Sequence, residues 1–146
     1  MTSTLPVTGV LRVDHVGLVV ADLEAAVARY ETLFGMRCEG IEVNVEQGVR
    51  EAMLQVASDP AGTRVQLLSP IATDSAVARF LERSGPGVQQ IAYTVADLDA
   101  AVAGLRAHGV RFLYDTPRRG TAGSRMTFLN PNDVGGILVE LVEPAR

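Results

Sequence analysis

The amino-acid sequence predicts an α+β fold in which two tandem βαβββ modules form a curved, cleft-bearing mixed sheet. One observation is an internal repeat: residues 13–28 recur as residues 88–103, and the octets 21–28 and 96–103 differ only by Glu24 against Asp99. A second is that similar segments, 64–70 and 138–144, close the two halves. A third is that strand-like and helix-like apolar patterns follow in the same order in both halves. A repeat of this kind indicates that one supersecondary unit occurs twice.

The first module is expected over residues 11–70, after a flexible N-terminal tail at residues 1–10. A strand over 11–20 precedes Asp22, whose carboxylate suits a helix N-cap. Apolar residues at helical spacing over 23–34 predict a helix that ends at Gly35. Strands over 37–45, over 50–56 and around Gln66 complete the module, with turns at 46–48 and 59–62.

Residues 71–87 are expected to connect the modules through a short helix, introduced by Pro70 and Asp74, and a Gly-Pro-Gly linker. The second module, residues 88–146, repeats the scheme with a strand over 88–95 and a helix from Asp97 to about Ala107. Strands follow near 111–114, 125–130 and 136–142. The whole chain is expected to form one compact domain.

Composition and charge exclude several function classes. A chain of 146 residues with 47% hydrophobic and 21% charged residues is typical of a soluble globular protein with one sizeable core. A net charge of −4 and the lack of a basic run disfavour nucleic acid as a partner. The single cysteine, Cys38, permits no internal disulfide. Residues 1–6 do not resemble a signal peptide, and no apolar run has the length of a membrane span. We therefore expect a cytoplasmic protein.

Four polar residues interrupt apolar strands at repeat-equivalent positions. His15 corresponds to Gln90, and Gln66 corresponds to Glu140. Buried polar groups need partners, because an unsatisfied one costs stability. Four such groups that arise symmetrically are expected to converge on one ligand. Taken singly, His15 would more often be a satisfied core histidine, and each glutamine would more often face solvent.

At these residues the chain resembles the vicinal oxygen chelate superfamily and, along nearly its whole length, the methylmalonyl-CoA epimerase family. The resemblance rests on the segments 14–17 (DHVG), 46–51 (EQGVRE), 65–70 (VQLLSP), 74–81 (DSAVARFL), 109–115 (GVRFLYD) and 139–142 (VELV), with the continuation 113–120 (LYDTPRRG). It implies a metal bound by His15, Gln66, Gln90 and Glu140, and it implies that Glu51 and Glu140 are the acid/base pair. It also implies a homodimer, an acyl-CoA thioester substrate and a role in propionate metabolism.

The chain departs from the family at one of these positions. Many members have histidine where this chain has Gln90, in a His-His pair that here reads Gln89-Gln90. An amide oxygen is a weaker, neutral donor than imidazole, and Gln90 could ligate directly or through water. One imidazole, two amide oxygens and one carboxylate suit an octahedral Co²⁺, Mn²⁺ or Mg²⁺ better than a closed zinc site. We expect Co²⁺, with Mn²⁺, Mg²⁺ and Zn²⁺ as alternatives.

The chemistry of the implied reaction explains why the site would need a divalent cation and two carboxylate bases. In 2-methylmalonyl-CoA the stereocentre lies between a thioester and a carboxylate, so removal of its proton gives an enolate whose oxygen a divalent cation can stabilise. Inversion calls for one base on each face. Some of these residues also have alternative interpretations. Glu51 could lie on an exposed strand face. The arginines near residue 120 could bind a phosphate or form a solvated hairpin tip; these are Arg118, Arg119 and Arg125.

Two other function classes compete with an epimerase. An iron dioxygenase of the same superfamily would need two histidines and one carboxylate, and only His15 is a histidine among the four positions. A glyoxalase-like enzyme is harder to exclude by its ligands, but it gives no reason for the segment 46–51. A metal-free small-molecule binding protein would be expected to carry more aromatic side chains than the 5% found here.

Overall fold

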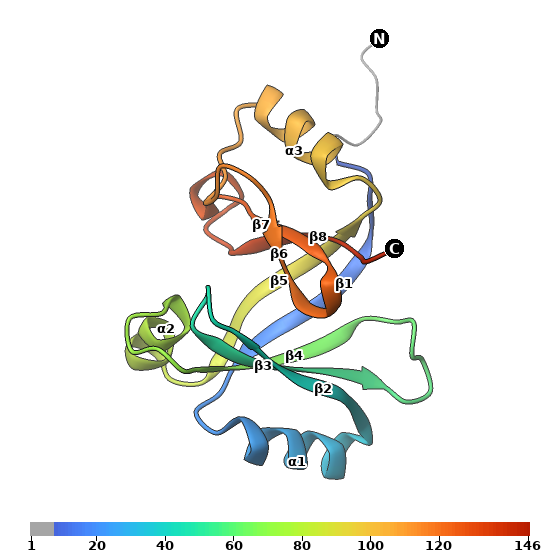
Figure 1. Cartoon of the computed structure of the whole chain (residues 1–146), viewed down its shortest axis with the longest axis vertical. Helices are drawn as coiled ribbons and strands as arrows, with labels where there is room; N and C mark the ends of the chain where they lie inside the picture. The colour runs from blue at the N-terminus through green and yellow to red at the C-terminus, as the bar shows by residue number, and fades with distance from the viewer. Residues whose placement is uncertain (1–7) are drawn as a thin grey trace. The chain divides into compact units, whose positions relative to one another are not determined.

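A computed structural model of the chain describes residues 8–146, which form two compact units (Figure 1). The N-terminal unit is His15–Gln89, and the C-terminal unit combines residues 8–14 with Gln90–Arg146. The first strand, β1 (Val10–Val19), contributes to both units, as does β5 (Gly87–Val95). Of the expected N-terminal tail, residues 1–7 lie outside the described part of the chain, and Val10 already belongs to β1.

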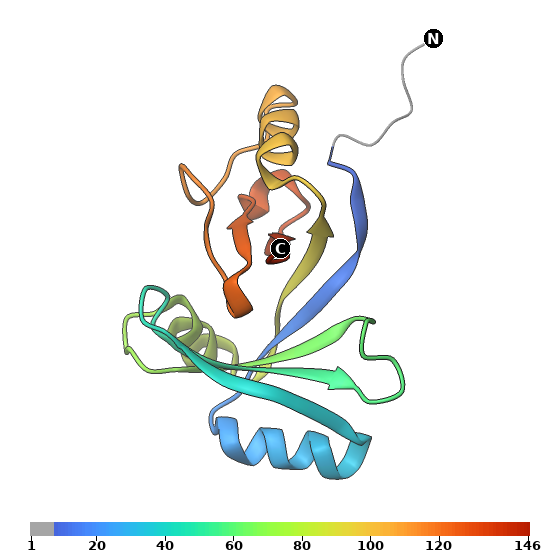
Figure 2. The same cartoon turned by 45° about the vertical axis from the view of Figure 1, so that its right-hand side comes forward.

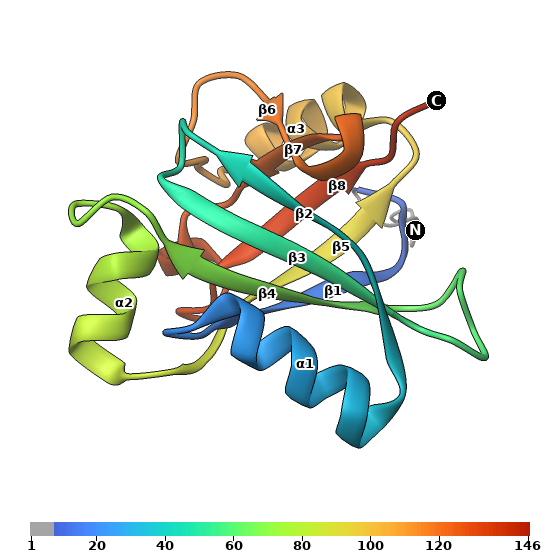
Figure 3. The same ribbon diagram turned by 60° about the horizontal axis from the view of Figure 1, so that its bottom comes forward.

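The N-terminal unit is a four-stranded mixed sheet with two helices. Its strands are β1, β2 (Met36–Asn44), β3 (Val49–Val56) and β4 (Arg64–Pro70), in the order β2-β3-β4-β1. β1 and β4 pair in parallel, whereas β2, β3 and β4 pair in antiparallel fashion. Helix α1 (Leu23–Phe34) runs along one face of this sheet (Figures 1 and 2). Helix α2 (Ala76–Ser84) lies beside the end of β4 (Figure 3).

Side-chain caps explain where the helices begin. The carboxylate of Asp22 accepts a hydrogen bond from the N–H of Ala25 at 3.0 Å, and Asp97 caps α3 (Leu98–Ala107) through the N–H of Ala100 in the same way. Gly35 ends α1 with φ of 63°, a conformation in which glycine has no Cβ to clash. These starts and this stop confirm the sequence expectations. For α2 the cap is Ser75, not Asp74.

The C-terminal unit contains four further strands and one α-helix. Its strands β5, β6 (Arg118–Arg119), β7 (Arg125–Phe128) and β8 (Val139–Glu143) follow the order β5-β8-β7-β6. β5 and β8 pair in parallel, and β6, β7 and β8 pair in antiparallel fashion. Two short 3₁₀ helices, η1 (Thr121–Gly123) and η2 (Pro131–Asp133), flank β7. Together with α3, these elements confirm the α+β fold of two βαβββ modules.

The strand expected near residues 111–114 is the one element that the sequence misplaced. In this segment, Phe112 makes an isolated bridge with Leu129, and the second strand of the module is the two-residue β6. The N–H of Arg111 donates to the carboxylate of Asp133 at 2.8 Å instead of to a neighbouring strand. The guanidinium of Arg111 binds the same carboxylate at 3.0 and 3.1 Å. Two backbone hydrogen bonds remain, from the N–H of Asn130 to the carbonyl of Arg111 at 2.8 Å and from the N–H of Leu113 to the carbonyl of Phe128 at 2.9 Å, so pairing here is limited to one bridge.

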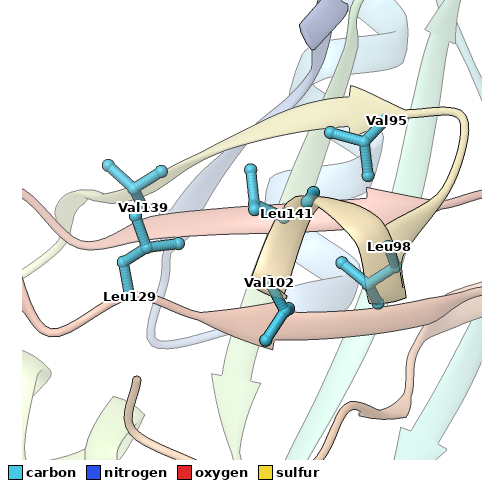
Figure 4. Packing of buried hydrophobic residues seen from close by; sticks show 7 residues of the cluster. Val95, Leu98, Val102, Leu129, Val139 and Leu141 are labelled. Atoms are coloured by element: carbon cyan, nitrogen blue, oxygen red, sulfur yellow. The ribbon is translucent and has the colours of Figure 1, made fainter. Parts of the chain in front are cut away.

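Each sheet buries one face under a helix. In the N-terminal unit, Ala52, Leu54 and Leu67 pack with Leu23 of α1. In the C-terminal unit, Leu98 and Val102 of α3 pack with Val95, Leu129, Val139 and Leu141 (Figure 4). Because successive strand residues point to opposite faces, the residues that alternate with these ones lie on the other face of their sheet.

The Arg111–Asp133 pair predicts a pH-dependent contribution to stability. Hydrogen bonds from the Arg111 side chain, then from its backbone N–H, hold the pKa of Asp133 below its ordinary value. A carboxyl whose pKa is lowered by folding stabilises the fold above its unfolded pKa of about 3.9, and this contribution is lost as the pH falls through the folded value. Asp133→Asn should therefore lower the thermal unfolding midpoint at pH 7 but have a smaller effect at pH 3.

The matched control is Asp115→Asn, which neutralises an exposed aspartate in the same unit. If Asp133→Asn and Asp115→Asn changed the midpoint equally at both pH values, the ion pair would contribute nothing to stability.

Candidate active site

All five residues that the sequence selects are buried, with exposed fractions of 6% or less. They lie on five different strands: His15 on β1, Glu51 on β3, Gln66 on β4, Gln90 on β5 and Glu140 on β8. Each alternates along its strand with residues of the helix-covered core, so each lies on the sheet face opposite α1 or α3. The exposed-strand interpretations of Glu51, Gln66 and Gln90 are therefore wrong.

In the N-terminal unit, the structure brings Glu51 and Gln66 into direct contact. The amide Nε2 of Gln66 donates a hydrogen bond to Oε2 of Glu51 at 3.1 Å. Register explains the contact, because Leu68 lies opposite Glu51 and Gln66 is two residues before Leu68 on the same face. Diagonal neighbours of this kind are within reach of long side chains. His15 has the same diagonal relation to Gln66 across β1 and β4, since Gly17 lies opposite Gln66.

Glu51 owes its position to the turn that precedes β3. Gly48 has φ of 68°, and a Cβ there would lie 2.9 Å from the Cβ of Ala72, so only glycine fits without a shift. The carboxamide oxygen of Asn44 accepts the N–H of Gln47 at 3.0 Å and closes the turn. The segment 46–51 is thus a turn that leads directly into a buried strand.

In the C-terminal unit, Gln90 and Glu140 form the corresponding pair. The Nε2 atom of Gln90 donates to Oε1 of Glu140 at 2.7 Å, a short bond between two buried side chains. The register is again diagonal: Ala92 lies opposite Glu140, and Gln90 is two residues before it. Phe128 is the neighbour of Glu140 on the other side, and it belongs to an apolar cluster with Ala92, Met126 and Val142. The carboxylate of Glu140 thus lies on a largely apolar face.

These side chains have the chemistry of a metal site for a hard divalent ion. Among residues 8–146, no three histidine, cysteine, aspartate or glutamate side chains gather as a metal centre. A metal site that uses any of these side chains would therefore need amide oxygens as well. Because each glutamine directs its nitrogen to a carboxylate, its Oε1 atom is the one that can bind a cation. Imidazole, amide and carboxylate donors fit Co²⁺, Mn²⁺ or Mg²⁺.

The remaining polar candidates make structural contacts. Arg125 binds Asp99 through two hydrogen bonds of 2.9 and 3.2 Å. The guanidinium carbon of Arg118 lies 3.9 Å from the centroid of the Tyr114 ring. The Nδ1 atom of His108 lies 3.1 Å from the carbonyl oxygen of Gly104, as suits an imidazole at a helix end. These contacts favour structural roles for Arg125 and His108.

Two buried or half-buried contacts were not foreseen. Thr94 donates a hydrogen bond to Asp14 at 2.8 Å, and both side chains are buried. Glu143 accepts the N–H of Leu98 at 3.1 Å at the start of α3. Each joins residues far apart in the chain, so no local signal pointed to it.

A family model described as the Glyoxalase/Bleomycin resistance protein/Dioxygenase superfamily matches residues 14–128. An ethylmalonyl-CoA/methylmalonyl-CoA epimerase of Cereibacter sphaeroides is 35% identical over 132 residues, covering 89% of this chain and 96% of that protein. The crystal structure of methylmalonyl-CoA epimerase from Mycobacterium tuberculosis is similar with a TM-score of 0.91 and 46% identity, over 100% of this chain and 94% of that one.

A variant of the Streptomyces coelicolor methylmalonyl-CoA epimerase, in complex with 2-nitronate-propionyl-CoA, is similar with a TM-score of 0.89. It is 48% identical, over 94% of this chain and 100% of that chain. No described helix is both long and apolar enough to cross a membrane.

Proposed function

We propose, from the premise that the chain belongs to the methylmalonyl-CoA epimerase family of the glyoxalase/bleomycin resistance protein/dioxygenase superfamily, that it interconverts (R)- and (S)-methylmalonyl-CoA. The observation that carries this proposal is that buried Glu51 and Glu140 each lie beside a glutamine on the sheet face opposite the helix. Similar proteins of known structure include one that holds an acyl-CoA analogue, which supports an acyl-CoA thioester as the substrate class.

Glu51 and Glu140 are the two bases of the proposed reaction. One enters as a carboxylate and takes the α-proton of the substrate, and the other enters as a carboxylic acid and delivers a proton to the opposite face. The electron pair of the broken C–H bond moves onto the thioester in between, and it forms the new C–H bond on the other side. After one turnover the two carboxyl groups have exchanged protonation states, which suits the reverse reaction.

His15, Gln66, Gln90 and Glu140 are the proposed ligands of a divalent ion. When bound, the ion would stabilise negative charge on the thioester oxygen and raise the acidity of the α-carbon. The donor set favours Co²⁺, with Mn²⁺, Mg²⁺ and Zn²⁺ as alternatives. Gln90 would bind through Oε1, directly or through water, because its nitrogen is donated to Glu140.

The organisation of the protein in the cell completes the proposal. We propose that the protein is cytoplasmic, because a chain with one free cysteine suits a reducing compartment. We also propose that it is a homodimer that acts in propionate metabolism. We further propose that residues 11–70 and 88–146, joined by 71–87, act as two catalytic half-modules, each supplying one base.

The metal proposal predicts that removal of divalent ions abolishes turnover. Exhaustive chelation should reduce epimerisation to background, and Co²⁺ or Mn²⁺ should restore it. Epimerisation can be followed by the conversion of one epimer to the other, with elemental analysis of the same samples. Undiminished turnover in protein shown to be metal-free would reject the metal mechanism.

The Gln90 proposal predicts a change in metal affinity. Gln90→His should bind Co²⁺ more tightly than the unmodified chain, because imidazole is a better ligand than an amide oxygen for this ion. Calorimetric titration of the metal-free proteins measures the difference. Gln89→His is the matched control, since Gln89 lies on the opposite face of β5 and should leave the affinity unchanged. Equal affinities in all three proteins would place Gln90 outside the metal site.

The two-base proposal predicts that Glu51→Gln stops inversion but leaves proton exchange on one face. The substitution keeps the side-chain shape, and Glu51 is not a proposed ligand, so the metal should be retained. Epimerisation should fall by about 10² to 10⁴-fold, the usual cost of losing a general base. In deuterated water, one epimer should still exchange its α-proton with retention of configuration, once the spontaneous exchange measured without enzyme is subtracted.

The control for this experiment is Glu31→Gln, which neutralises an exposed glutamate of α1 and should leave the rate unchanged. If Glu51→Gln inverted the substrate at close to the unmodified rate, Glu51 would not be a base.

A further inference from the structure

Each proposed base receives a hydrogen bond from a glutamine amide within its own unit. Gln66 donates to Glu51 at 3.1 Å, and Gln90 donates to Glu140 at 2.7 Å. The two bonds have the same construction, because in both units the glutamine lies on the adjacent strand, two residues before the residue opposite the glutamate. The repeat itself does not require this. It aligns Gln66 with Glu140, so the donor of one unit occupies the place of the acceptor in the other.

A glutamate side chain on an open strand face has several rotamers of similar energy, and only some of them direct its carboxylate at one carbon atom of a substrate. A hydrogen bond to a charged group is about twice as strong as one between neutral groups, and burial excludes competing water. All four side chains are 4–6% exposed. The amide N–H therefore restricts where each carboxylate can lie.

We propose that Gln66 and Gln90 are positioning residues, each of which orients one base: Gln66 orients Glu51, and Gln90 orients Glu140. This role rests on the proposed epimerase function and is additional to metal ligation. The Nε2 atom of each glutamine orients the base, and its Oε1 atom serves as the ligand. Each face of the substrate thus has its own orienting amide, so proton removal from one epimer can be impaired without proton removal from the other.

The two roles of a glutamine differ in their consequences for the two epimers. Both epimers give the same charged species after proton removal. Loss of a metal ligand weakens stabilisation of that charge, so it slows proton removal from both epimers alike. Loss of an orienting hydrogen bond slows proton removal only from the epimer that the affected base serves. Exchange of the α-proton, measured separately for each epimer, therefore separates positioning from ligation.

The test uses Gln66→Met and Gln90→Met in the full chain, since methionine has a similar length and donates no hydrogen bond. Initial α-proton exchange in deuterated water is measured for (R)- and (S)-methylmalonyl-CoA at saturating Co²⁺, with metal content determined on the same samples.

The Glu51→Gln variant identifies the epimer that Glu51 serves, because it abolishes the α-proton exchange of that epimer. Gln66→Met should slow exchange of that epimer roughly 10- to 100-fold relative to the other, the rate equivalent of one hydrogen bond to a charged group. Gln90→Met should slow the opposite epimer.

Matched controls are Gln55→Met on β3 and Gln89→Met on β5, which make the same change at half-buried positions away from the two glutamate contacts. Both should exchange the two epimers at unmodified rates. If Gln66→Met fails to fold, as judged by circular dichroism, Gln66→Glu keeps an oxygen ligand, removes the N–H donor and takes its place.

Equal slowing of both epimers by Gln66→Met and Gln90→Met would overturn the inference and leave ligation as the role of both glutamines. No slowing at all would overturn it as well. A failure of the unmodified chain to exchange or epimerise methylmalonyl-CoA would instead reject the proposed function, so the two failures are distinguishable.

Discussion

The alternation of side chains along a strand is the constraint on which this structure depends. One face of each sheet is committed to a helix, with Leu23 of α1 packed on Ala52, Leu54 and Leu67 in one unit and Leu98 of α3 packed on Val95 and Leu141 in the other. Once these faces are fixed, a slip of one residue would bury the wrong set of side chains. The same register places Glu51 and Gln66, and Gln90 and Glu140, on the remaining face of each sheet. The hydrophobic core thereby sets the position of every candidate site residue.

The parts of the fold that were predicted correctly depend on short-range signals. Asp22 and Asp97 cap helices through an N–H three residues away, and Gly35 ends a helix through its own backbone conformation. Burial of His15, Gln66, Gln90 and Glu140 followed from their positions within apolar strands that the chain repeats, whereas Glu51 was selected only through the family resemblance. In each case the physical cause lies within a few residues of the signal.

The parts that were missed depend on partners far away in the chain. The segment around Arg111 has a strand-like composition, but Asp133 takes up its N–H and its guanidinium, and its backbone pairing is limited to one bridge. Glu143 at the end of β8 accepts the N–H of Leu98 in the first turn of α3, 45 residues away in the chain. The amide–carboxylate bonds were missed for the same reason, since they follow from a diagonal register that the sequence does not state.

The presence of glutamine at position 90 can be understood from the geometry of its side chain. The nitrogen and oxygen of an amide point in different directions, so one glutamine can donate to Glu140 and still offer an oxygen to a cation. An imidazole bound to a metal through one nitrogen keeps a single donor on the far side of a rigid ring. The amide is the weaker metal ligand, but its nitrogen adds a hydrogen bond of 2.7 Å to Glu140. Gln66 combines the same two capacities beside Glu51. A site with two glutamines would therefore hold its metal less tightly than one with histidine at position 90, while each of its bases keeps a dedicated hydrogen-bond donor.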